Sequence, residues 1–219
     1  MKANMKKTLV SSAVAGALMV GTVGFSTAKA ELEFNVGVFS DYILYGLSES
    51  NNNAVVQGGV DWGHESGFYL GSWWSTLGDG DGQEVDLYLG YEFAAGDVDF
   101  DIGYVYYYYP GLDDADFGDI VATVGYGPVY ASVNYAIHAD DSDVTDSAYY
   151  AIGGEAEVMP DLSLGAELGY ADPDVGDDWT FWSLGLTKST GMGDFSLTYA
   201  DTDDSDEDPL FVVGYTMSF

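Results

Sequence analysis

The side chains of this sequence that could do chemistry are mostly carboxylates, and almost no cations balance them. Beyond residue 30 the only basic residue is Lys188, set against 37 Asp and Glu, and the chain contains no Arg and no Cys. Carboxylates in excess can carry acid–base chemistry, hold metal ions or line a path for cations. Which of these applies depends on where the acids gather and on the elements that hold them.

A histidine and a serine stand at a catalytic spacing in one segment, His64-Glu65-Ser66-Gly67. This is the His-x-Ser spacing of outer-membrane lipid hydrolases, in which the imidazole activates the serine hydroxyl as a nucleophile. The alternative is a short turn that joins two strands. His138, the other His of the chain, lies beside an acidic segment and has no serine at that spacing.

Three acidic tracts, at residues 79–84, 140–143 and 203–208, have the oxygen-rich spacing of calcium-binding loops. None has the full pattern of such a loop, so a solvated acidic loop is the favoured interpretation at each tract. Taken together the tracts make a stronger case for bound Ca²⁺ or Mg²⁺, and no other cofactor is expected. The candidate ligands are Asp79, Asp81, Asp203, Asp204 and Asp206.

The elements that hold these residues are predicted to be strands. From residue 31 onward apolar and polar residues alternate with a period of two, as in Leu32, Phe34 and Val36 against Glu33 and Asn35. Most segments have the ~9–11 residues that a tilted strand needs to cross a bilayer. The predicted strands are 32–44, 54–62, 68–77, 84–93, 98–109, 117–124, 129–138, 148–158, 162–170, 179–187, 194–200 and 209–219.

The first thirty residues are predicted to be a cleaved signal peptide. Lys2, Lys6 and Lys7 precede an apolar run from residue 9 to residue 25, and Ala28-Lys29-Ala30 supplies the small–x–small cleavage pattern. We therefore predict a signal peptide at residues 1–30 and a single mature domain at residues 31–219.

The connections between the predicted strands alternate in length and charge. Those after the odd-numbered strands are longer and hold 20 of the 37 acids, whereas the turns after the even-numbered strands hold three. Long loops on one side and tight turns on the other are typical of an outer-membrane barrel with both termini in the periplasm. His64 and Ser66 then fall in a periplasmic turn, away from the outer-leaflet surface where lipid hydrolases act, so the chain is not predicted to be an enzyme.

A secreted β-sandwich would also alternate with a period of two. The sorted loops, the aromatic residues near segment ends and the chain end at Phe219, with apolar residues at every second position before it, favour a barrel. Such a terminal aromatic is typical of barrels handled by the outer-membrane insertion machinery. The predicted fold is all-β: a transmembrane antiparallel up-and-down β-barrel of about 12 strands in the outer membrane of a Gram-negative bacterium.

Several segments of the sequence are similar to those of a known family: Asn35–Tyr42 with Gly46 and Ser48, Gln57–Asp61, Glu65–Gly71, Glu84–Tyr88 and Gly103–Pro110. In these segments the chain resembles the TorF family of porins. The resemblance implies an outer-membrane barrel with a channel role and no catalytic residues. Members usually have Arg before the glycine that matches Gly46, whereas this chain has Tyr45, so the resemblance implies no anion preference.

If the apolar face of the barrel meets lipid, the opposite face lines the interior. An unpaired buried carboxylate costs several kcal/mol, and no luminal cation is available, so these acids are expected to meet water or a metal ion. We therefore predict a hydrated lumen that favours cations. The predicted lumen and selectivity residues are Glu33, Asp61, Asp86, Glu92, Asp99, Asp101, Glu155, Glu157 and Glu167.

Four tyrosines, Tyr88, Tyr107, Tyr109 and Tyr149, are predicted to project into the same lumen. Their rings could offer sugars or other planar solutes a sliding surface. The favoured alternative is that they fill space in the barrel while each hydroxyl stays in contact with water.

The predicted function is a porin-like channel for passive diffusion of small solutes, either cations or neutral molecules. The alternative is a non-conducting structural or adhesive surface barrel whose acidic outer loops bind divalent cations.

The expected partners are outer-membrane lipid, lipopolysaccharide, small solutes and the barrel insertion machinery. So acidic a chain is not expected to bind nucleic acid, and the sequence assigns no oligomeric state. A saline habitat, where salt screens the repulsion between acids, is a second explanation of the charge.

Overall fold

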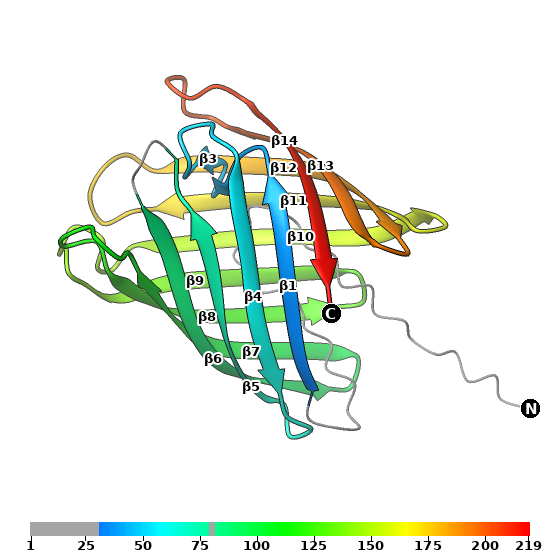
Figure 1. The fold of residues 1–219 in the computed structure, drawn as a ribbon. Helices are drawn as coiled ribbons and strands as arrows, with labels where there is room; N and C mark the ends of the chain where they lie inside the picture. The colour runs from blue at the N-terminus through cyan, green and yellow to red at the C-terminus, as the bar shows by residue number, and fades with distance from the viewer. Residues whose placement is uncertain (1–30, 79–81) are drawn as a thin grey trace, which may run out of the picture.

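The computed structural model describes residues 31–78 and 82–219, and within them twelve antiparallel strands close into a barrel (Figure 1). No described segment is a helix long and apolar enough to cross a membrane. The predicted signal peptide and the candidate ligands Asp79 and Asp81 lie outside the described residues. The barrel strands are β1 (Glu31–Phe39), β4 (Val55–Gly63), β5 (Phe68–Thr76), β6 (Gln83–Ala95), β7 (Val98–Tyr108), β8 (Phe117–Tyr126), β9 (Val129–Ala139), β10 (Ala148–Met159), β11 (Leu162–Asp172), β12 (Trp179–Thr190), β13 (Gly193–Thr202) and β14 (Leu210–Ser218).

The barrel wall is apolar on its outer face and polar within. On β6 the side chains of Leu87 and Leu89 are 52% and 50% exposed, whereas Glu84 and Asp86, on the other face of the strand, are 0% and 6% exposed. A sandwich would bury its large apolar side chains, but this closed sheet turns them outward, as a barrel in lipid does. The predicted fold class is therefore confirmed.

The seam of the barrel lies between the first and last strands. β1 pairs with β4 over its whole length on one side and with β14 over residues 35–39 on the other. Phe219 extends the seam: its N–H donates to the carbonyl of Phe34 (2.9 Å), and its own carbonyl accepts the Phe34 N–H (3.2 Å). The terminal aromatic residue thus takes part in barrel closure through its backbone.

One of the predicted strands, 32–44, was wrong in its extent. β1 ends at Phe39, and a separate small hairpin follows, made of β2 (Ile43–Leu44) and β3 (Leu47–Ser48). The hairpin turns at Tyr45 and Gly46, whose φ angles are 50° and 84°. Two successive positive φ values are the geometry of a type I′ hairpin turn. The apolar residues of this segment alternate like those of a strand, which is why the sequence pattern extended β1 too far.

Residues 40–54, here called the inner hairpin, lie across the loop end of the barrel. The Tyr42 ring packs edge-on against Trp73 of β5 at 5.4 Å, and its hydroxyl donates to Glu84 of β6. Tyr45 stacks on Tyr149 of β10. Because β5 and β6 are separated from β10 around the closed sheet, a segment that touches all three must cross the interior. Figure 1 shows β3 within the outline of the barrel near its loop end.

The inner hairpin is braced by one buried carboxylate. Asp41, which is 6% exposed, accepts hydrogen bonds at Oδ1 from the hydroxyls of Ser48 and Ser50, both at 2.7 Å, and from the Tyr42 N–H at 2.8 Å. These bonds tie the start of the hairpin to its return arm. The segment therefore has an internal structure of its own and does not rely on the wall alone.

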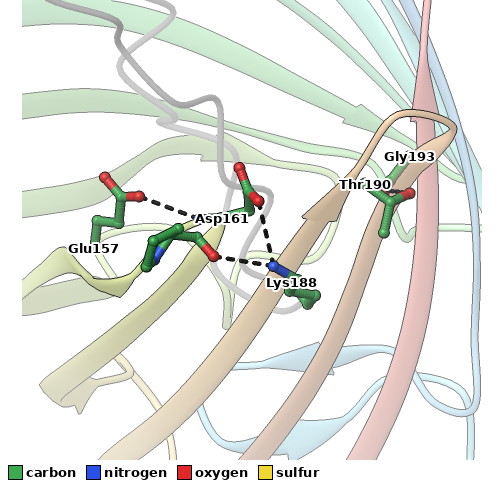
Figure 2. A network of polar contacts seen from close by, with 6 residues as sticks. Glu157, Asp161, Lys188, Thr190 and Gly193 are labelled. Atoms are coloured by element: carbon green, nitrogen blue, oxygen red, sulfur yellow. Dashed lines mark hydrogen bonds and ion pairs between the residues drawn. The ribbon is translucent and has the colours of Figure 1, made fainter.

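The opposite end of the barrel carries the tight turns and the chain's single Lys beyond residue 30. Lys188 donates to the carbonyl of Pro160 at 3.0 Å. Its ammonium lies 3.5 Å from the carboxylate of Asp161, the ion pair that Figure 2 shows. The side chains of Lys188 and Asp161 are 49% and 70% exposed, so this ion pair contributes only about 0–1 kcal/mol to stability. Its place at the turns leaves the described interior without a Lys or Arg partner.

Replacing Leu184 with Arg should destabilise the barrel by about 2–4 kcal/mol, because Leu184 lies midway along β12 with its side chain 46% exposed on the apolar face. Ser183→Arg is the matched control, since Ser183 lies opposite Glu167 of β11 and an Arg there gains an acidic partner. Equilibrium unfolding by denaturant in lipid vesicles measures both changes. Equal losses for the two variants would contradict the assignment of the faces.

Candidate functional site in the barrel interior

Tyrosine hydroxyls are hydrogen-bonded to many of the interior carboxylates. A phenol brings a neutral donor, and a hydrogen bond to a charged acceptor is stronger than one between neutral groups. The interior is therefore tied together without cations. The bonds run from Tyr42 and Tyr109 to Glu84 (2.8 and 2.5 Å), from Tyr69 to Asp101 (3.2 Å), from Tyr88 to Asp61 and from Tyr130 to Glu167.

Two of these bonds follow one geometric pattern, in which the tyrosine reaches over a glycine of the intervening strand. Tyr88 of β6 pairs in register with Gly71 of β5, which pairs with Asp61 of β4. A Cβ at Gly71 would lie 2.5 Å from the Tyr88 ring, so the absence of a side chain there opens the path for the phenol. An equivalent row joins β9, β10 and β11: Tyr130 pairs with Gly153, which pairs with Glu167.

The expectation that interior acids meet only water or a metal ion was therefore incomplete. It counted charged partners and omitted neutral donors. The hydroxyls of Tyr88 and Tyr109 donate to carboxylates, a partner that the expectation did not include. Tyr69 and Tyr130 were missed as site residues. Their positions carry a signal nevertheless, because Tyr69 alternates with the outward-facing Phe68 and Leu70.

Glu84 is the point at which the inner hairpin joins the wall. Its side chain is 0% exposed, with one carboxylate oxygen bonded to Tyr42 of the hairpin and the other to Tyr109, which follows β7. Burial, followed by the charge of Glu84, raises the pKa of Tyr42 well above its usual value. The Tyr42 phenol therefore stays protonated and remains a donor throughout the physiological range.

The other side of the inner hairpin is held by aromatic rings. Tyr45 and Tyr149 stack with their centroids 3.9 Å apart and 5° between their planes. Trp179 of β12 donates its indole N–H to the Tyr45 carbonyl at 2.9 Å. Gly46 approaches β12 so closely that a Cβ there would lie 2.8 Å from the Cβ of Phe181. Tyr149, predicted to project into the lumen, is thus part of the hairpin's anchor.

More acids lie around the inner hairpin. Glu49 belongs to the hairpin, and its side chain keeps an exposed edge. Its enclosure by barrel atoms, and then the charge of Glu84, raise the pKa of Glu49 to about 7. Asp86 of β6 and Asp119 of β8 are buried in the wall beside Tyr107 of β7. The loop end of the interior is consequently acidic, and part of its charge varies near neutral pH.

A second group of acids lines the turn half of the barrel. The strand register places Glu33 directly opposite Asp61, and Glu92 directly opposite Asp101. Opposed like charges repel, and at Glu92 and Asp101 no described Lys or Arg offsets them. Asp61, Glu92 and Asp101 are partly buried, whereas Glu33 is exposed. Such an arrangement attracts cations and repels anions.

The remaining predicted lumen residues are dispersed along the wall. Glu167 lies in the interior with Tyr130, and Glu155 is partly buried on β10. Asp99 and Glu157 are exposed near the turns. Glu157 accepts the N–H of Asp161 at 3.1 Å and so belongs to the turn network that Figure 2 shows.

The His64–Ser66 contact forms, with Nδ1 and Oγ 2.9 Å apart. The same Nδ1 accepts the Ser66 N–H at 3.2 Å, and the His64 carbonyl accepts the Gly67 N–H at 2.9 Å. These are the short-range bonds of a tight turn between β4 and β5. The geometry fits the structural interpretation of this segment.

The acids of the last outer loop bond to the backbone. Asp203 accepts the Thr180 N–H at 2.7 Å, and Asp204 accepts the Asp206 N–H at 2.9 Å. Among the residues that the structure describes, no three Asp, Glu or His side chains come together as metal ligands. Binding of Ca²⁺ or Mg²⁺ at the loops stays a prediction.

A closed antiparallel sheet that is apolar outside and polar inside defines a β-barrel of the transmembrane type. The KdgM porin has a similar structure (TM-score 0.59, 9% identity, covering 86% of this chain and 98% of that one), as does the KdgM porin in complex with disordered oligogalacturonate (0.59, 8%, 86% and 98%). The NanC porin is also similar (TM-score 0.53, 10% identity, 86% and 98%). At these identities the likeness concerns the fold.

The sequence has no match among curated proteins. A family model described as "Bacterial protein of unknown function (Gcw_chp)" matches residues 25–215. The chain therefore belongs to the Gcw_chp family.

Replacing Tyr42 with Phe should loosen the inner hairpin, because buried Glu84 then loses one of its two donors. We expect the hairpin to be destabilised by about 1–3 kcal/mol, seen as faster amide hydrogen exchange in residues 40–54. Tyr91→Phe, on the outer face of β6, is the control. If amide hydrogen exchange in residues 40–54 were unchanged in Tyr42→Phe, the Tyr42–Glu84 hydrogen bond would not contribute to anchoring the hairpin.

Proposed function

We propose that the protein is a porin-like channel of the outer membrane, through which small solutes diffuse passively, and that it is not an enzyme. The observation that carries the proposal is the pairing of like charges on the interior wall of a barrel whose outer face is apolar. Opposed carboxylates such as Glu92 and Asp101 are tolerated where water or passing ions reach them, and they are costly in a sealed core. The resemblance of several sequence segments to the TorF family of porins supports the same channel role.

The proposed solutes are cations or small neutral molecules. Among the described residues the interior wall carries acids but no Lys or Arg, since Lys188 is held at the turns. Carboxylates in such positions favour cations. One of the similar structures is a KdgM porin with oligogalacturonate, a polymer of carboxylated sugars. We propose that this chain does not share that ligand class, because its own carboxylates would repel it.

Planar-bilayer recording of the purified barrel under a KCl gradient should show conductance with a reversal potential of the cation-selective sign. In the triple variant Asp61→Asn, Glu92→Gln, Asp101→Asn the cation-to-anion permeability ratio should fall toward one, because the turn half of the lumen loses its three partly buried carboxylates. Absence of conductance, or an anion-selective potential in the parent, would end the proposal.

The control removes the same number of acids from an outer loop: Asp203→Asn, Asp204→Asn, Asp206→Asn. These side chains are exposed, so bulk salt screens them and selectivity should stay near that of the parent. A saline habitat alone would explain the acidity without any role for interior charge. In that case neither triple variant would change the selectivity.

A non-conducting surface barrel is the alternative, and the inner hairpin across the loop end favours it. In this proposal the structural role comes from the outer loops, whose acids face the phosphates of lipopolysaccharide. Divalent cations would bridge the two, and the barrel would serve as a structural or adhesive element. The partners proposed in either case are outer-membrane lipid, lipopolysaccharide and the insertion machinery.

Removal of divalent cations should destabilise the outer loops. At low salt, EDTA is expected to lower the thermal unfolding temperature of the parent in detergent by roughly 5 °C more than that of a variant without these loop acids, because loop-bound Ca²⁺ or Mg²⁺ stabilises the folded state by mass action. The loop variant Asp203→Asn, Asp204→Asn, Asp206→Asn should respond less. Indifference of the parent protein to EDTA would rule out loop-bound metal.

A further inference from the structure

Two carboxylates and one phenol beside the inner hairpin carry polar atoms without partners. In the part of the chain that the structure describes, Oδ1 of Asp86, Oδ1 of Asp119 and the hydroxyl of Tyr107 are buried and make no hydrogen bond. The three side chains are 6%, 1% and 2% exposed. Glu84, on the same face of β6 as Asp86, shows the contrast: it is fully buried, but two phenols satisfy it.

The three side chains occupy one patch of the wall. Asp86 lies directly opposite Tyr107, and Asp119 lies opposite Val105, two residues before Tyr107 on the same face of β7. Diagonal neighbours of this kind are about 7–8 Å apart, so Tyr107 stands between the two carboxylates. Its ring stacks on Phe117 at 4.2 Å, which fixes its direction.

The chemistry of this patch suits a hard cation. A buried carboxylate without a partner costs several kcal/mol, and the chain's single Lys beyond residue 30 is held at the far end of the barrel. Two carboxylates and a hydroxyl form an all-oxygen donor set, which hard cations prefer. No third acid converges on them among the described residues, so a bound ion would keep part of its water.

We propose that Asp86, Asp119 and Tyr107 form a cation site inside the loop end of the barrel, and that it binds Ca²⁺ as a partly hydrated ion. Ca²⁺ accepts irregular shells of about six to eight oxygens, water included, and its charge matches two carboxylates. The site is separate from the acidic outer loops, and it does not require the barrel to conduct. An ion there would offset negative charge next to Tyr45, at the tip of the inner hairpin.

Thermal unfolding of the full barrel in detergent at low salt tests the site, with Ca²⁺ alone added back after EDTA treatment. All proteins carry Asp203→Asn, Asp204→Asn and Asp206→Asn to reduce binding at the loops. In this parent, saturating Ca²⁺ should raise the unfolding temperature by about 5 °C. Asp86→Asn, Asp119→Asn should abolish the rise, and Tyr107→Phe should move it to higher Ca²⁺ concentration.

The matched control is Glu92→Gln, Asp101→Asn, which also removes two interior carboxylates. Asp101 has one unpartnered oxygen, but its other oxygen accepts the Tyr69 hydroxyl. Loss of the Ca²⁺ shift in Asp86→Asn, Asp119→Asn, with retention in this control, supports the site. No shift in the parent, an unchanged shift in Asp86→Asn, Asp119→Asn, or equal losses in both variants overturns it.

Two further measurements keep the outcomes separate. Circular dichroism checks that each variant has folded, and Asp86→Asn alone replaces the double variant if that one does not fold. Bilayer recording of the same proteins reports on the channel independently. A barrel that binds Ca²⁺ at Asp86 and Asp119 but passes no current would leave the site standing and remove the proposed channel.

Discussion

The interior of this barrel depends on a hydrogen bond between a neutral phenol and a carboxylate. A barrel that turns acids inward must satisfy their oxygens, and a chain with one Lys beyond residue 30 cannot do so with ion pairs. Tyrosine meets the requirement because its hydroxyl stands at the end of a long, rigid ring. Tyr88 crosses from β6 to β4, Tyr69 from β5 to β7 and Tyr130 from β9 to β11, so each bond skips one strand. The phenols therefore tie neighbouring parts of the wall together from within, in addition to the backbone ladder.

The same requirement explains why glycine recurs on the inner face. A phenol can cross a strand only where that strand carries no side chain at the crossing point. Gly71 and Gly153 lie in register between donor and acceptor, and a Cβ at Gly153 would stand 2.6 Å from the Tyr130 hydroxyl. Glycine in the interior of a strand is destabilising, since it adds backbone freedom to the unfolded chain and has no side chain to pack against its neighbours. In these rows that cost is offset by a charge-assisted hydrogen bond.

The strands were predictable because their signal is local. Alternation with a period of two, punctuated by Gly and Asp, located the barrel strands within a few residues, and the alternation of loop length gave the topology. The interior was predictable only in its composition. Which acid meets which phenol depends on how residues 25 to 42 positions apart in the sequence are brought together, as for Tyr109–Glu84 and Tyr42–Glu84. The inner hairpin was missed for a related reason: Ile43 and Leu44 fit a strand pattern equally well. The positive φ angles at Tyr45 and Gly46 show that the chain turns there, and the contacts of Tyr42 and Tyr45 with opposite parts of the wall show that it crosses the interior.

Satisfying a carboxylate is different from neutralising it, and this difference matters for the interior as a whole. A Lys partner would have supplied both a hydrogen bond and an opposite charge, whereas a phenol supplies only the bond. An interior built on phenols is therefore linked across its strands while its carboxylates have no Lys partner among the described residues, from Asp101 near the turns to Glu84 beneath the inner hairpin. At Oδ1 of Asp86 and Oδ1 of Asp119 no phenol donates, although Tyr107 lies beside both residues. The cation proposed for this patch would supply the positive charge that the protein itself does not.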